Sequence, residues 1–119
     1  VAGFVDAAIA VFARDAASGR LGFVNVVRDA PGGSLAGVTS IALDSAGRRL
    51  YSVSIGGALS AFARSATVGS LTLLETVRDG VDGIDGLGGA RSVVTAGDGS
   101  SLYAAGSTDS AIAFFSIND

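Results

Sequence analysis

The sequence predicts an all-β chain made of repeated four-stranded antiparallel meanders. Three observations lead to this prediction. The chain repeats itself with a period of about 50 residues, each period divides into four segments of strand length, and Gly, Asp and Ser are concentrated between the segments. Tandem repeats of four short strands at this spacing are typical of the blades of β-propellers. We therefore expect propeller blades.

The end of the chain restates its beginning. AGFVDAAIAVF (2–12) and AGSTDSAIAFF (105–115) share seven of eleven residues at an offset of 103. A repeat that returns after 103 residues leaves room for one further copy in between. The sequence therefore predicts that the first and last segments occupy the same place in two different blades.

A middle copy lies between these two segments. FARDAASGRL (12–21) returns at an offset of 50 as FARSATVGSL (62–71), and SIALDSAGRRLY (40–51) aligns at an offset of 52 with SVVTAGDGSSLY (92–103). The Gly-rich loop between the two alignments absorbs the difference. We expect roughly two and a quarter blades in an incomplete ring, with a partial blade at 1–37, a full blade at 38–89 and a partial blade at 90–119.

Each period contains four short segments. In the middle copy they are 59–64, 70–78, 90–95 and 102–105, and we expect these four to form one meander. Gly47 and Gly99 occupy the same place in two copies, between adjacent segments. Gly supplies the positive φ that a tight hairpin turn needs, and Asp hydrogen-bonds to the backbone of its own turn, so both predict turns here.

An amphipathic helix is the alternative for 7–19, because Ala and Arg favour helices and Gly19 could end one. The repeated copies argue for a strand instead. LSAFARSATVG (59–69) contains Ser, Thr and Val, which are weaker helix formers, and AIAFFSIND (111–119) has two adjacent Phe. The last segment has the pattern of a strand buried on both faces.

Tyr51 and Tyr103 each follow a Leu in the same segment of two copies. A buried Tyr supplies a large apolar ring and usually finds a hydrogen-bond partner for its hydroxyl. We expect both to be core aromatic residues rather than platforms on which a ligand stacks.

Composition excludes several classes of protein. The chain contains 49% hydrophobic residues and has a mean hydropathy of +0.55. Its longest apolar run, 7–13, is nevertheless far shorter than the roughly 20 residues of a membrane-spanning helix. The sequence contains neither Cys nor His, so it offers no disulfide, no thiolate metal site and no histidine base. The net charge is −3 and no basic run is present, which argues against nucleic-acid binding.

Two pairs of segments resemble the repeats of a known family. SIALDSAGRRLYSVS (40–54) and SVVTAGDGSSLYAAGSTDSAIAFFS (92–116) resemble blades of bacterial lactonase-like and YVTN-type β-propellers. SGRLGFVNVVRDAPGG (18–33) and GSLTLLETVRDGVDG (69–83) resemble the following segment of the same repeat. The resemblance covers nearly the whole chain.

This resemblance implies a propeller fold and one enzymatic activity, the hydrolysis of sugar lactones or muconate lactones. Such a site would draw groups from several blades around the central channel. The motifs involved mark turns and core positions, and the usual Pro-Asp of the first turn is Ser45-Ala46 in one copy and Gly97-Asp98 in the other. The resemblance also implies a secreted or cell-surface location.

One loop carries a candidate metal site. Asp79, Asp82 and Asp85 are three residues apart in RDGVDGIDGLGG (78–89), and Gly follows each of them. Carboxylate oxygens on a flexible loop are the ligands that calcium prefers. The spacing differs from that of an EF-hand, and the matching loop of the first copy keeps only Asp29. A solvated loop is therefore the favoured alternative, and calcium is the only cofactor that the sequence suggests.

Arg-Asp pairs recur at the end of the last strand of the predicted blades 1–37 and 38–89, as Arg28-Asp29 and Arg78-Asp79. A surface or inter-blade ion pair is the favoured interpretation, and such pairs contribute little when they are exposed. The alternative is a ligand-facing rim, because binding residues concentrate on the loops of a scaffold.

Three hypotheses for the function follow. The leading one is a noncatalytic propeller module that acts as a binding or scaffold element. The second is a structural subunit that assembles into a ring or filament, and the third is a fragment of a lactonase-like hydrolase. Open propeller ends need covering, so the expected partners are further blades of a longer chain or identical copies of this one.

Overall fold

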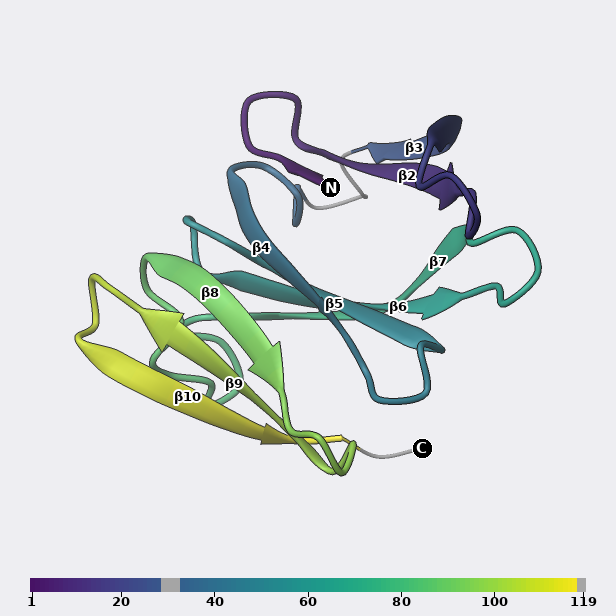
Figure 1. Cartoon of the computed structure of the whole chain (residues 1–119). Helices are drawn as coiled ribbons and strands as arrows, with labels where there is room; N and C mark the ends of the chain where they lie inside the picture. Colours follow the sequence, from purple (N-terminus) through teal and green to yellow (C-terminus); the bar gives the residue numbers. More distant parts are fainter. Residues whose placement is uncertain (29–32, 118–119) are drawn as a thin grey trace.

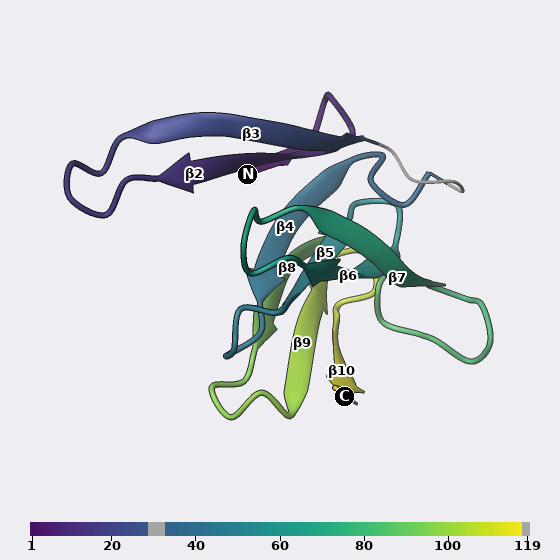
Figure 2. The same cartoon turned by 90° about the vertical axis from the view of Figure 1, so that its right-hand side faces the viewer.

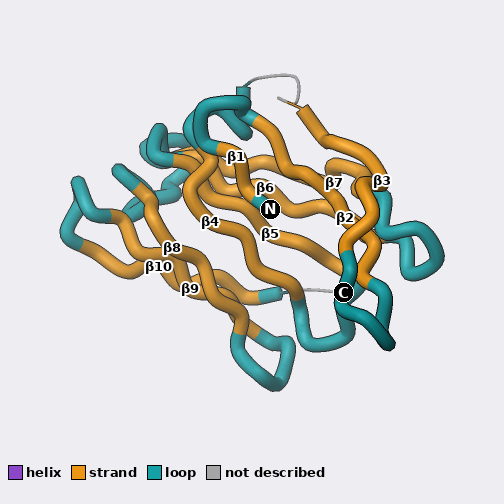
Figure 3. Tube along the Cα trace, turned by 45° about the horizontal axis from the view of Figure 1, so that its top comes forward, coloured by secondary structure: helices purple, strands orange, loops and turns teal. Residues whose placement is uncertain are grey.

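The structure, a computed structural model, describes residues 1–28 and 33–117. Ten β-strands joined by turns and loops make up this part of the chain (Figures 1 and 3). The strands are β1 (Ala2–Gly3), β2 (Ala8–Arg14), β3 (Leu21–Arg28), β4 (Val38–Leu43), β5 (Arg49–Ser54), β6 (Ala58–Arg64), β7 (Leu71–Arg78), β8 (Ala90–Thr95), β9 (Ser101–Gly106) and β10 (Ala111–Ser116). Within these residues, no helix has the length and hydrophobicity needed to cross a membrane.

The strands form three antiparallel sheets. The first sheet has the order β1-β2-β3, the middle sheet β4-β5-β6-β7 and the last sheet β10-β9-β8. Figure 2 shows β2 and β3 lying across the remaining strands at one side of the molecule. The predicted all-β class is confirmed, and the middle sheet is one complete four-stranded meander.

The hairpins of the first and middle sheets have the same register. Phe12 pairs with Phe23 in the first sheet, and Phe62 pairs with Leu73 in the middle sheet, 50 residues later in each case. Each hairpin also has a β-bulge just before its Phe. The offset read from the sequence is therefore an offset in three dimensions, and we call two residues at the same register position in two sheets counterparts.

The last sheet repeats the first three strands of the middle sheet. Ala42 pairs with Tyr51, and 52 residues later Val94 pairs with Tyr103. The next hairpin keeps the correspondence, because Leu50 pairs with Phe62 and Leu102 pairs with Phe115. β8, β9 and β10 are therefore the counterparts of β4, β5 and β6.

The predicted grouping of the segments 59–64, 70–78, 90–95 and 102–105 into one meander was wrong. The first two lie in the middle sheet and the last two in the last sheet. The long connection at 79–89 crosses from one sheet to the next, whereas short turns join neighbouring antiparallel strands. The segments themselves were predicted correctly as strands. The predicted full blade at 38–89 contains β4 to β7, the four strands of the middle sheet.

The segment for which a helix was the alternative is a strand. β2 pairs with β1 on one side and with β3 on the other, which fixes it within the first sheet. Ala8 and Ile9 are buried at its start, and burial becomes weaker towards Arg14. The strand prediction is confirmed because tertiary pairing outweighs the helix propensity of Ala.

Two core clusters lie between the three sheets. Between the first and middle sheets, the buried residues are Ile9, Leu35, Val38, Leu50 and Phe62. Between the middle and last sheets, they are Tyr51, Val53, Leu59, Ala61, Leu87, Ala90, Val93, Leu102, Ala104 and Ala113. The middle sheet is therefore covered on both faces, as a blade within a propeller is.

The turns at Gly47 and Gly99 have the same conformation, as their matching places predict. Their φ angles are 69° and 75°, in the region that favours Gly. In the second turn, the Asp98 carboxylate accepts a hydrogen bond from the Ser100 N–H at 2.9 Å, and this bond holds the pKa of Asp98 below its usual value.

The two tyrosines have different surroundings. Tyr51 lies in the core as predicted, but Tyr103 is 39% exposed and contacts Phe114, with 5.3 Å between ring centroids. The prediction of a core position was wrong for Tyr103, because no sheet covers this face of the last sheet in the described residues. For the same reason the strand of Ile112 and Phe114 is not buried on both faces.

Candidate functional site

The loop of the candidate metal site starts where β7 ends. The Asp79 N–H donates to the Gly57 carbonyl at 2.9 Å, which ties the start of the loop to the β5–β6 turn. The Asp79 carboxylate in turn accepts a hydrogen bond from the Leu87 N–H at 3.0 Å. Leu87 is fully buried, so the carboxylate holds the loop closed over the core.

Three carboxylates meet at this loop. Asp79, Asp85 and Asp109 each place an oxygen within 4.8 Å of the other two. Asp109 comes from the β9–β10 connection and accepts a hydrogen bond from the Gly88 N–H at 2.9 Å. Asp82 is exposed, has a φ of 53° and does not belong to this group. Two of the three predicted residues are thus brought together, with a third that sequence reasoning missed.

A signal for Asp109 was present in the sequence. It is the repeated Asp of the two AG-x-x-D segments, where Asp6 is its equivalent. The two connections also share an unusual backbone, because Ala7 has a φ of 51° and Ser110 a φ of 52°. Only the fold shows that this connection lies beside the loop that follows β7.

Hydrogen bonding explains the acidic residues of this cluster. Each of Asp79, Asp85 and Asp109 accepts a backbone N–H bond within the loop at 2.9–3.0 Å. Calcium takes roughly six to eight oxygen ligands, and these same carboxylates would have to supply many of them. Calcium binding at this cluster therefore stays a prediction.

The Arg-Asp pairs are only partly described. Arg78 is the last residue of β7, and Arg28 is the last residue of β3, at the matching place. Asp29 lies outside the described residues. Because Asp79 accepts the Leu87 N–H, its role in closing the loop is established by geometry, whereas the rim ion pairs stay predictions.

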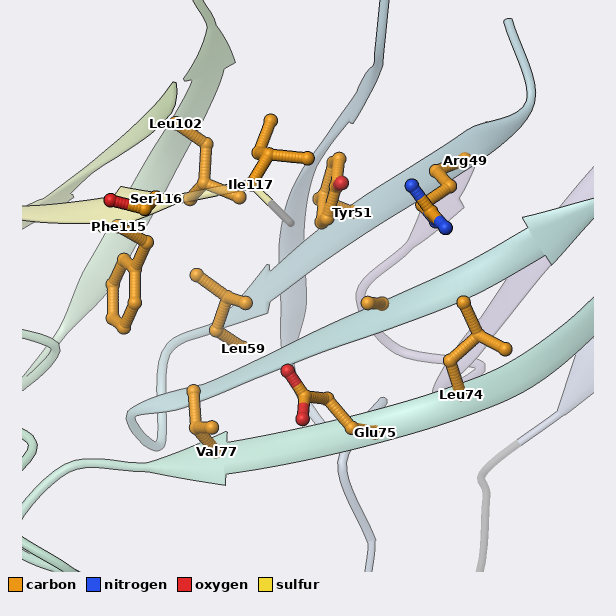
Figure 4. Close-up of a pocket in the computed structure, with 11 residues that line it drawn as sticks. Arg49, Tyr51, Leu59, Leu74, Glu75, Val77, Leu102, Phe115, Ser116 and Ile117 are labelled. Atoms are coloured by element: carbon orange, nitrogen blue, oxygen red, sulfur yellow. The ribbon is translucent and has the colours of Figure 1, made fainter. Parts of the chain in front are cut away.

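A cavity of about 380 Å³ lies between the middle and last sheets. Its walls come from β5, β6 and β7 on one side and from β9, β10 and the residue after β10 on the other, and Figure 4 shows these side chains. The lining residues are Arg49, Tyr51, Leu59, Ala61, Leu74, Glu75, Val77, Leu102, Phe115, Ser116 and Ile117. Arg49 and Glu75 are its charged residues, and most of the others are apolar. A second hollow of about 300 Å³ shares Arg49 and Leu74 with it.

The outer face of the first sheet exposes large apolar side chains. Phe12, Leu21 and Phe23 are all exposed there, and the two Phe rings contact each other edge to face. Their counterparts in the middle sheet are Phe62, Leu71 and Leu73, which pack into the core against the first sheet. The exposed face is thus the one that receives the preceding sheet wherever such a sheet is present.

The outer face of the last sheet shows the opposite half of the same arrangement. Its exposed apolar residues are Val94, Tyr103, Ile112 and Phe114. Their counterparts in the middle sheet are Ala42, Tyr51, Leu59 and Ala61, which pack into the core against the last sheet. This exposed face is the one that receives the following sheet.

Solved structures share this arrangement of sheets. The chain superimposes on a 6-phosphogluconolactonase-like protein of Bacteroides fragilis with a TM-score of 0.76 and 19% identity, covering 97% of this chain and 30% of that one. For the periplasmic gluconolactonase PpgL of Pseudomonas aeruginosa, the TM-score is 0.75 and the identity 22%, covering 96% and 31%. For the β-propeller domain of Cps50 (Swd1) from Myceliophteria thermophila, the TM-score is 0.67 and the identity 15%, covering 95% and 35%.

These likenesses show the fold. The chain has the blade architecture of β-propellers, including that of lactonase-like proteins, and it spans about a third of the length of the structures it matches. No protein-family model matches the sequence, and no curated protein sequence does either.

Proposed function

We propose that the chain is a noncatalytic β-propeller module that acts as a binding or scaffold element, and that further blades cover its two outer faces. One observation carries this proposal. The residues exposed on the first and last sheets are counterparts of residues that the middle sheet buries against its neighbours. The two faces therefore match the two halves of an inter-blade contact.

The energetics favour covering both faces. Burial of a large apolar side chain stabilises by about 1.5–3 kcal/mol, and each face exposes several of them. Exposed apolar faces of this kind mark interaction surfaces. The covering blades would belong to a longer chain or to identical copies of this one. The resemblance to YVTN-type and lactonase-like repeats supports a secreted or cell-surface protein.

A charge placed on one face tests this proposal. Phe23→Asp puts an unpaired carboxylate on the outer face of the first sheet, so we expect it to weaken the association of the chain with itself. Val68→Asp is the matched control, because Val68 is exposed in the β6–β7 turn and belongs to neither face. Sedimentation velocity measures the association. Equal effects of the two variants on association would contradict the proposal. A chain that stays monomeric without any substitution would exclude identical copies as the covering blades.

A lactonase-like hydrolase is the second candidate. It is supported by the superposition on a 6-phosphogluconolactonase-like protein and on a protein named as a periplasmic gluconolactonase, which share the blade geometry over nearly the whole chain. Catalysis would fall to carboxylates, Ser or Tyr, because the sequence lacks His and Cys. The test asks whether the associated chain hydrolyses a panel of sugar lactones. The acid that hydrolysis releases is measured as base uptake at constant pH. Turnover above the buffer rate would favour this candidate, and its absence would argue against it.

A further inference from the structure

The last sheet has one strand fewer than the middle sheet. β8, β9 and β10 are counterparts of β4, β5 and β6, and β10 forms the edge of its sheet at the place where β7 continues the middle sheet. In the described part of the chain, no strand lies beside this edge of β10. The backbone N–H and C=O groups along such an edge are a template for another strand.

The cavity of about 380 Å³ lies beside this edge. Four apolar residues of its lining, one from each of four strands, are Leu59, Val77, Leu102 and Phe115. Their counterparts one sheet earlier are Ile9, Val27, Leu50 and Phe62. All four counterparts belong to the core between the first and middle sheets, so the cavity is the equivalent of a packed region.

β7 contributes to that packed region. Leu71 and Leu73 pack against the core between the first and middle sheets. At the turn before β7, an added Cβ on Gly69 would lie 3.5 Å from Cγ1 of Val11, whose counterpart Ala61 lines the cavity. The cavity is therefore where a fourth strand of the last sheet would place two apolar side chains.

We infer that the groove between β7 and β10 binds an extended polypeptide segment that resembles β7. This inference rests on the proposed function and names the partner for one of its sites. The segment pairs antiparallel with β10 through backbone hydrogen bonds, and apolar side chains at its first and third positions enter the cavity. Because Phe62 pairs with Leu73, the residue at the third position lies opposite Phe115.

A peptide with the sequence of residues 70–79, SLTLLETVRD, is the probe, with both ends blocked and a fluorophore attached. We expect saturable binding of one peptide per chain, measured by fluorescence anisotropy. The control peptide carries Leu71→Asp and Leu73→Asp, and we expect it to bind roughly tenfold more weakly or worse, because the apolar contacts are lost. Equal binding of the two peptides would overturn the inference.

A cavity-filling variant locates the bound peptide. Ala61→Phe should reduce binding of the unmodified peptide by a similar factor, because the larger side chain occupies the cavity. Val11 and Phe114 occupy the same repeat position in the other two sheets, so the strand itself accepts a larger side chain there. Full binding by a folded Ala61→Phe variant would overturn the inference.

A disulfide tests the register. The chain has no Cys, so a single one can be placed at will. Ala63 pairs with Thr72, and Ser116 is the counterpart of Ala63. A peptide with Thr72→Cys should therefore cross-link to a Ser116→Cys chain. It should not do so with Ala111→Cys, which lies about 16 Å away along the strand at ~3.3 Å per residue. Equal cross-linking at both positions would overturn the predicted register.

These outcomes separate the inference from the proposed function. The Phe23→Asp variant should bind the peptide as the unsubstituted chain does, because Phe23 lies on the far face of the first sheet. If the peptide fails to bind while Phe23→Asp still weakens association, the strand-binding inference alone is wrong. If the peptide binds but Phe23→Asp leaves association unchanged, the proposed function is wrong.

Discussion

Gly106 shows how backbone crowding dictates a residue type. It ends β9, and an added Cβ would lie 2.9 Å from the carbonyl oxygen of Gly88 and closer still to that of Gly86. The loop after β7 passes directly over this position. The sequence contains 18 Gly and does not distinguish this one from those in turns, because the crowding comes from a segment distant along the chain.

Gly106→Ala should lower the free energy of unfolding by about 1–3 kcal/mol, since backbone atoms must move to admit the methyl group. Gly22→Ala is the matched control within β3, where no atom lies within 4 Å of the added Cβ. The control should be neutral or slightly stabilising, because Gly weakens a strand interior. Urea denaturation followed by circular dichroism measures both. Equal stability of the two variants would show that the loop does not press against β9.

The acidic cluster was predictable only in part. The regular spacing of Asp79, Asp82 and Asp85 predicted that their three carboxylates would meet at one candidate metal site. The backbone instead folds through a hydrogen bond from the Gly80 N–H to the Ile84 carbonyl, and Asp82 lies outside the group. Asp109 replaces it from another connection. Local spacing does not reveal such a contact, because it depends on how two loops meet.

At the scale of the strands, the sequence was more informative. The expected segments agree with β6 to β9 within one or two residues, and the offsets of 50 and 52 recur in the strand registers. Segments of strand length and the turn-forming Gly between them are local signals, so they mark where strands begin and end. Which strands share a sheet depends on the path of the loop after β7, and the grouping of 59–64 and 70–78 with 90–95 and 102–105 was wrong there.

Phe62 and Phe12 provide a test of the sheet arrangement. They hold the same position in two sheets, but Phe62 is 1% exposed and Phe12 is 41% exposed. Phe62→Ala should cost about 3–5 kcal/mol of unfolding free energy through the cavity it leaves. Phe12→Ala should cost much less, as judged by urea denaturation in dilute solution. Comparable losses of unfolding free energy in the two variants would contradict an arrangement in which a neighbouring sheet covers Phe62 and leaves Phe12 uncovered.

Residues 1–28 and 33–117 form a run of three sheets, and among these residues only the middle sheet is covered on both faces. The repeat predicted an incomplete ring, and the likeness to structures about three times as long agrees with that architecture. The exposure of Tyr103 was not predictable from the sequence. Its counterpart Tyr51 is buried, and the difference between them comes from the neighbouring sheet rather than from the strand itself.

In the proposed function, the two outer faces of the molecule are complementary halves of one contact. The most direct measurement is the native mass of two variants, alone and mixed, by size exclusion with light scattering. Phe23→Asp spoils the first-sheet face, and Ile112→Asp spoils the last-sheet face, where Ile112 is 73% exposed. Each variant alone should have the mass of one chain, 11.6 kDa, because it keeps only one half of the contact.

In an equimolar mixture, the intact last sheet of the first variant should pack on the intact first sheet of the second. We expect a discrete species of twice the chain mass that contains one copy of each variant. A mixture in which both variants keep the mass of one chain would contradict it, as would equally strong association of either variant alone.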